Sequence, residues 1–167
     1  MLDFLNDIGI KVCLEHIEAK TFLPGLDFRE GALIVDREKL LYPGDILHEA
    51  GHLACMPPDI RKTMTGNLEN NNINQGGEMM AIAWSYAACL YLEIEPEVVF
   101  HEQGYKGAGS SIVTNFNEGK YFGVPLLEWC GMCYDTPTAR RLNKQPFPKM
   151  ISWACEKNRY AESAEML

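Results

Sequence analysis

The chain has 167 residues, of which 47% are hydrophobic and 23% charged, the composition of an ordinary globular protein. Its formal net charge of −8 argues against a protein that binds nucleic acid or an anionic membrane surface, and no apolar run is long enough to span a membrane. The first seven residues carry acids where a secretory signal carries bases. We therefore expect a cytoplasmic protein with reduced thiols and a single domain over residues 1–167.

The first third of the chain predicts a short helix and a small sheet. Residues 1–20 have apolar side chains at weak helical spacing and then become extended. Residues 32–35, Ala-Leu-Ile-Val, form a short apolar run between Gly31 and Asp36, which is typical of a buried strand. We expect two or three short strands in residues 21–36 to form a small antiparallel sheet.

The next segment predicts an apolar helix that begins after the N-cap residue Asp45 and ends before Pro57. It contains the pattern H-E-x-x-H at His48, Glu49 and His52. On a helix the two histidines lie one turn apart on the same face, so their imidazoles can converge on one metal ion. Glu49 stands about 100° round the helix, beside such an ion, where a general base is required.

The pattern is short enough to arise by chance, but its setting favours a metal site. Two histidines and a glutamate on a buried helix are costly unless they are paired or bound to a metal. Gly51, inside the same helix, lowers helix propensity by about 1 kcal/mol relative to alanine. We infer that another segment approaches the helix closely at that position.

A polar stretch without periodicity, residues 59–77, predicts a surface loop. It is followed by the most apolar segment of the chain, residues 78–92, which predicts the central buried helix. Glu78 is the only charged residue in that segment. It either occupies the first turn, where the helix dipole favours an acid, or points inward at the metal.

The remainder of the chain predicts shorter helices over residues 97–103, 111–118 and 125–132, with Gly104 capping the first of them. His101 falls in the last turn of that helix, where the dipole favours a positive charge, or it belongs to the site. After these helices comes a proline-rich segment that connects them to an apolar run over residues 150–154. This run predicts either a helix or a strand. Cys130 and Cys133 form a single C-x-x-C, which we interpret as two buried thiols rather than a structural zinc site or a redox pair.

The motif helix after a short sheet resembles the zincin metallopeptidases. Cys55 and Pro58 stand where the metzincin branch has glycine and histidine, so the resemblance is to the gluzincin branch, whose third ligand is a glutamate on the next helix. Glu78 looks like that ligand, although Ile82 replaces an acid that several gluzincin families place one turn later. The chain is also similar to small bacterial cytoplasmic anti-repressor-type metalloproteases.

The resemblance implies an α+β, minimal zincin-like fold, in which a small antiparallel sheet packs on the H-E-x-x-H helix and a second buried helix carries Glu78, with further helices towards the C-terminus. It implies zinc held by His48, His52 and Glu78, with a position left for water, and Glu49 as the base that activates that water. Three residues are candidates to stabilise the oxyanion: His101, Tyr105 and Tyr121. Residues 32–35 resemble the zincin edge strand that binds an extended peptide.

The function expected from these residues is that of a zinc-dependent metallohydrolase acting on a peptide or protein substrate, without nucleic-acid or membrane partners. Two alternatives stay open: a zincin-fold module that binds metal or protein without catalysis, and a metal-dependent hydrolase of a non-peptide amide. The oligomeric state does not follow from the sequence.

Overall fold

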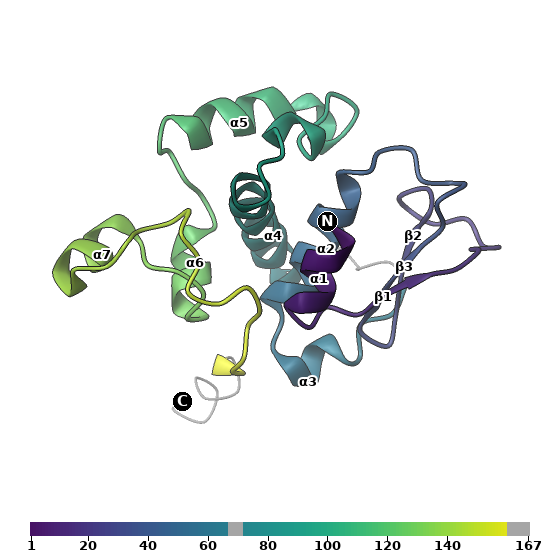
Figure 1. Cartoon of the computed structure of the whole chain (residues 1–167), viewed down its shortest axis with the longest axis horizontal. Coiled ribbons are helices and arrows are strands. Elements are labelled where there is room, and N and C mark those ends of the chain that lie inside the picture. The colour runs from purple at the N-terminus through teal and green to yellow at the C-terminus, as the bar shows by residue number, and fades with distance from the viewer. Residues whose placement is uncertain (67–71, 160–167) are drawn as a thin grey trace.

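The computed structural model describes residues 1–66 and 72–159, which form a mixed α+β structure with one small sheet and seven α-helices (Figure 1). In chain order the elements are α1 (Leu2–Asp7), β1 (Val12–Leu14), β2 (Leu26–Arg29), β3 (Ala32–Val35), α2 (Asp45–Cys55), α3 (Pro58–Arg61), α4 (Asn72–Tyr91), the 3-10 turns η1 (Pro96–Val98) and η2 (Tyr105–Gly107), α5 (Gly109–Asn117), α6 (Val124–Trp129) and α7 (Thr136–Leu142). None of the described helices is long and apolar enough to cross a membrane.

The sheet is mixed, so the predicted antiparallel sheet is wrong in one pairing. The strand order is β1-β3-β2, with β2 antiparallel to β3 and β1 parallel to it. The β2–β3 hairpin turns at Glu30 and Gly31, whose positive φ values of 49° and 76° suit a two-residue hairpin turn. Residues 15–25 connect β1 to β2, which lie on opposite sides of β3. Because β3 has a partner on both sides, residues 32–35 are not an edge strand.

Helix α2 lies between the sheet and α4 and contacts both β3 and α4 (Figure 1). A Cβ atom at Gly51 would lie 3.1 Å from the Ala81 carbonyl oxygen and 3.2 Å from Cε3 of Trp84. The close approach predicted from Gly51 is therefore confirmed, and the neighbour is α4. This contact sets the separation of the two helices, and hence the distance between the side chains that face each other across them.

The C-terminal end of α2 is held by Arg61, the last residue of the short helix α3. Its guanidinium donates to the carbonyl oxygens of Leu53 at 2.7 Å, Met56 at 3.0 Å and Cys155 at 2.9 Å. The backbone N–H of Cys155 in turn donates to the Ala54 carbonyl at 2.7 Å. Carbonyls at a helix end lack partners within the helix, so these bonds satisfy them and fix the end of the motif helix.

Helix α4 begins at Asn72, six residues before the predicted start, so the polar stretch 59–77 is not one loop. The first part of the stretch 59–77 belongs to α3, and residues 67–71 lie outside the described residues. Gly76 and Gly77 suggest a turn but lie within α4, where a Cβ atom at Gly77 would be 3.3 Å from Cε of Met56. Glycine serves close packing at this point rather than chain reversal.

The C-terminal helices follow the predictions unevenly. Helices α5 and α6 overlap most of the predicted 111–118 and 125–132 segments, and each begins and ends before the predicted bounds. The helix predicted over 97–103 is wrong: only the 3-10 turn η1 forms, and Gly104 is extended with φ −87° and ψ 171°. Helix α7 was not predicted, although Asp135 caps it by accepting a hydrogen bond from the Thr138 N–H at 2.8 Å. Residues 150–154 form neither a helix nor a strand beyond one bridge to Cys133.

Candidate metal centre

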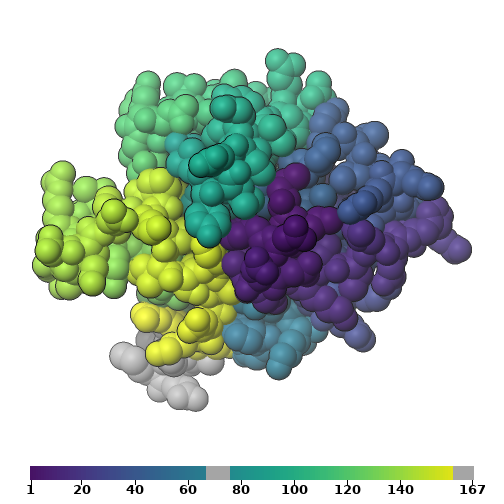
Figure 2. All heavy atoms as spheres, viewed as in Figure 1, coloured from purple at the N-terminus to yellow at the C-terminus, as the bar shows by residue number. Residues whose placement is uncertain are grey.

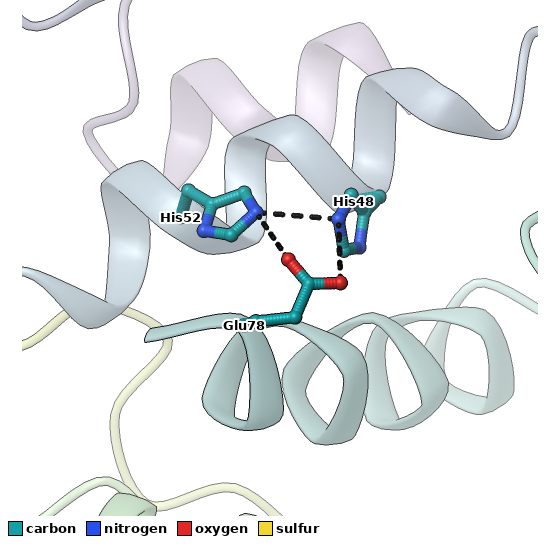
Figure 3. Close-up of side chains that lie close together, drawn as sticks. All are labelled: His48, His52 and Glu78. Carbon is teal, nitrogen blue, oxygen red and sulfur yellow. Dashed lines mark hydrogen bonds and ion pairs between the residues drawn. The ribbon is translucent and has the colours of Figure 1, made fainter. Parts of the chain in front are cut away.

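Three side chains from two helices meet between α2 and α4 (Figure 3). The Nε2 atoms of His48 and His52 are 3.2 Å apart. Glu78 reaches across from α4, with Oε1 3.5 Å from Nε2 of His48 and Oε2 3.2 Å from Nε2 of His52. Because Glu78 lies well inside α4, its position is not explained by the dipole at the helix start, and the inward orientation is confirmed.

The separations between these atoms fit a tetrahedral metal ion. Ligands bound at 2.0–2.2 Å in tetrahedral geometry lie about 3.3–3.6 Å from one another. The two Nε2 atoms are 3.2 Å apart, and each lies 3.2–3.5 Å from one of the two Glu78 carboxylate oxygens, Oε1 for His48 and Oε2 for His52, which is close to that range. Two imidazole nitrogens and one carboxylate form a donor set that leaves a fourth position open. Within residues 1–66 and 72–159, this is the only group of three or more histidine, cysteine or acidic side chains able to hold a metal ion.

Burial and charge differ across the group. Both histidine side chains are about 10% exposed, whereas the Glu78 side chain is 45% exposed. Burial alone would raise the pKa of Glu78, but the hydrogen bonds from His48 and His52 outweigh it and hold that pKa well below its ordinary value. Glu78 is therefore an anion facing two imidazoles, on the side of the site that solvent reaches.

Glu49 lies on α2 beside His48 and is half-buried. Burial raises its pKa to about 7; the charge of His52 opposes this rise, and those of Glu78 and Asp45 add to it. Glu49 is not one of the three residues of the His48–His52–Glu78 group. A carboxyl group with a pKa near neutrality can both accept and release a proton.

Tyr105, the first residue of η2, contacts His48. Its ring stands edge-on to that of His48, with centroids 5.3 Å apart. Its hydroxyl is buried and has no hydrogen-bond partner among the described residues. Burial and the charges of Glu78, Asp45 and Glu49 raise its pKa, so the hydroxyl stays protonated and can donate. The Tyr105 backbone is left-handed, with φ 53°, and Lys106 follows with φ 55°, a sparsely populated conformation for non-glycine residues.

The other two oxyanion candidates are engaged elsewhere. His101 Nε2 is 3.0 Å from Oδ1 of Asp45, and its ring stacks on Tyr42 at 3.9 Å. Tyr121 packs against Phe116 and Phe147. The sequence predicts Asp45 as the N-cap of α2, but Asp45 is the first residue of that helix and its side chain pairs with His101. No sequence signal marked that pair, because its members are more than fifty residues apart.

Cys130 and Cys133 are buried thiols at and just beyond the end of α6, as predicted. The neighbouring Cys155 thiol and burial raise the pKa of Cys130, and Cys133 Sγ lies 4.0 Å from the Val124 carbonyl oxygen. Neither cysteine belongs to the metal-binding group.

Comparisons with protein-family models, with curated proteins and with solved structures found no match for this chain. What the described residues establish is a His-His-Glu group, on two packed helices, that could hold a metal ion.

Proposed function

We propose that this chain is a zinc-dependent metallohydrolase, and specifically a peptidase with a zincin-like arrangement of its two central helices. The observation that carries the proposal is the convergence of His48, His52 and Glu78 at separations suited to one tetrahedral ion. Glu49 adjoins this group without joining it, as the proposed base must.

Each residue has a distinct part in the proposed reaction. His48, His52 and Glu78 hold the zinc ion, which when bound supplies Lewis-acid chemistry for a carbonyl and acidifies water. Glu49 takes a proton from the attacking water and delivers it to the leaving nitrogen. Tyr105 donates its hydroxyl hydrogen to the carbonyl oxygen as that oxygen gains negative charge. The contact of the Tyr105 ring with that of His48, together with a buried hydroxyl that has no partner among the described residues, supports this last role.

The zincin comparison changes in one respect. An extended substrate cannot pair with β3, because β1 and β2 occupy both of its sides. The free edges of this sheet belong to β1 and β2, which have three and four residues. We propose that a peptide or protein substrate is held mainly through side chains near the site rather than by a long strand pairing.

A direct test is digestion of a broad peptide mixture by the zinc-loaded protein, with products identified by mass spectrometry. Cleavage is expected. A chelator should stop it, because it removes the zinc ion from His48, His52 and Glu78. Re-addition of zinc should restore cleavage. A protein that carries one zinc ion and cleaves no peptide would favour the two alternatives: a non-catalytic module, or a hydrolase of a non-peptide amide.

Tyr105→Phe is expected to lower the rate of peptide cleavage by about 100-fold, the usual effect of removing one donor to a developing oxyanion. Zinc content should not change, because Tyr105 is not a ligand. Thermal stability should be unchanged or slightly higher, because the lost hydroxyl is buried and unpartnered. Tyr121→Phe is the matched control and should retain the wild-type rate. Equal rates for Tyr105→Phe and wild type would remove Tyr105 from the mechanism.

A further inference from the structure

A groove of about 490 Å³ lies at the far end of α4, between that helix and residues 145–153. Leu90 and Tyr91 of α4, with Pro146, Pro148 and Trp153, give it an apolar lining, and Lys149 also lines it. Leu90 is 43% and Tyr91 is 59% exposed, high values for such large side chains. Figure 2 shows the end of α4 and the yellow segment adjoining on the visible face. The groove therefore presents apolar surface to solvent.

Positive charge is concentrated in the segment that forms one wall of this groove and in helix α7, which precedes it in the chain, although the chain as a whole is acidic. Six of the fifteen basic residues lie within residues 136–159, which contain a single acid, Glu156, in a chain of net charge −8. The cations Arg140, Arg141, Lys144 and Lys149 are exposed. Within residues 1–66 and 72–159, none of these four forms an ion pair. Helix α7, which carries the first two, projects from the body of the molecule (Figures 1 and 2).

We propose that this groove, together with the cations of α7 and Lys149, is a docking surface for an acidic peptide segment of a partner protein that inserts apolar side chains. Carboxylates on the segment would face Lys144 and Lys149, and its apolar side chains would cover Leu90 and Trp153. The glutamates that follow α4, Glu93, Glu95 and Glu97, do not line the groove.

Charge and shape together favour a peptide over other partners. A nucleic-acid site needs a broad positive field, whereas the exposed cations here form one small patch of four on a chain of net charge −8. An apolar groove with a basic rim instead matches a segment with both acidic and apolar side chains. Leu90 lies twelve residues beyond Glu78 on α4, about 18 Å along the helix axis, so the groove is separate from the metal centre. Docking there requires no hydrolysis.

The test is fluorescence anisotropy with a labelled twelve-residue peptide in which Glu and Asp alternate with Leu and Phe. It is titrated with the zinc-loaded protein, and mass spectrometry verifies that the peptide stays intact. Saturable binding is expected, weakened by added salt, and a peptide with Lys in place of its acids should not bind. Lys144→Glu with Lys149→Glu should weaken binding by about tenfold or more, and Leu90→Ser by about fivefold.

Lys20→Glu with Lys62→Glu is the matched control, because it makes the same change in net charge at exposed sites outside residues 136–159. It should change the affinity by less than about twofold. An equal loss in both double variants would reduce the effect to net charge and overturn the proposal. Tighter binding of a labelled oligonucleotide than of the acidic peptide would also overturn it, in favour of nucleic acid. A concentration-dependent dimer that Leu90→Ser dissociates would identify a second copy as the occupant instead.

Discussion

Glu49→Gln is expected to lower the rate of peptide hydrolysis by about 10²- to 10⁴-fold, the usual contribution of a positioned general base. The amide keeps the size of the carboxylate but cannot accept a proton. Zinc content should stay at the wild-type level, because Glu49 stands beside the His48–His52–Glu78 group and not within it. The measurement is the initial rate of product formation on one cleaved peptide, with metal analysis of the same sample.

The matched control for this change is Glu38→Gln, which makes the same substitution at an exposed position between β3 and α2. Its hydrolysis rate should equal that of the wild type. If Glu49→Gln cleaves the peptide as fast as the wild type while holding zinc, the general-base assignment is wrong. If Glu49→Gln loses zinc as well, the residue supports the ligands and the loss of activity says nothing about proton transfer.

The motif half of the site could be predicted from the sequence because it is local. Helical periodicity alone places His48 and His52 on one face of α2, and the structure confirms that placement. Glu78 was different, since its assignment rested on the resemblance and its reach depends on how α2 packs on α4. Gly51 gave the one local sign of that packing, through its approach to Ala81.

The errors came where a pattern specifies an element but not its partner. An apolar run such as residues 32–35 predicts a strand, yet nothing in it reveals that β1 pairs with it in parallel. Gly76 and Gly77 suggest a turn and instead lie within α4, where only Gly77 is closely approached, by Cε of Met56. The choice of Tyr105 over Tyr121 depends on the contact between its ring and that of His48, more than fifty residues away in the chain, which no periodicity predicts.

His52→Ala is expected to remove most of the zinc from the protein, because it leaves one imidazole and one carboxylate where three ligands converge. Binding to the folded state alone also stabilises that state. Free zinc at 100 times its dissociation constant should add about 2.7 kcal/mol to the free energy of unfolding of the wild type. For a chain of 167 residues this corresponds to a rise in Tm of about 5–10 °C.

In His52→Ala the zinc-dependent rise in Tm should disappear, as measured by thermal melts with and without added zinc. Because His52 is buried, the variant could also unfold for lack of packing, so Glu78→Gln serves as a second test at a side chain that is 45% exposed. The amide keeps the packing and weakens the ligand, so the metal-dependent rise should shrink while the metal-free Tm stays near that of the wild type. His16→Ala, at an exposed histidine paired with Asp36, should retain full zinc and the full rise. Full zinc occupancy in both His52→Ala and Glu78→Gln would show that the ion is held by other residues.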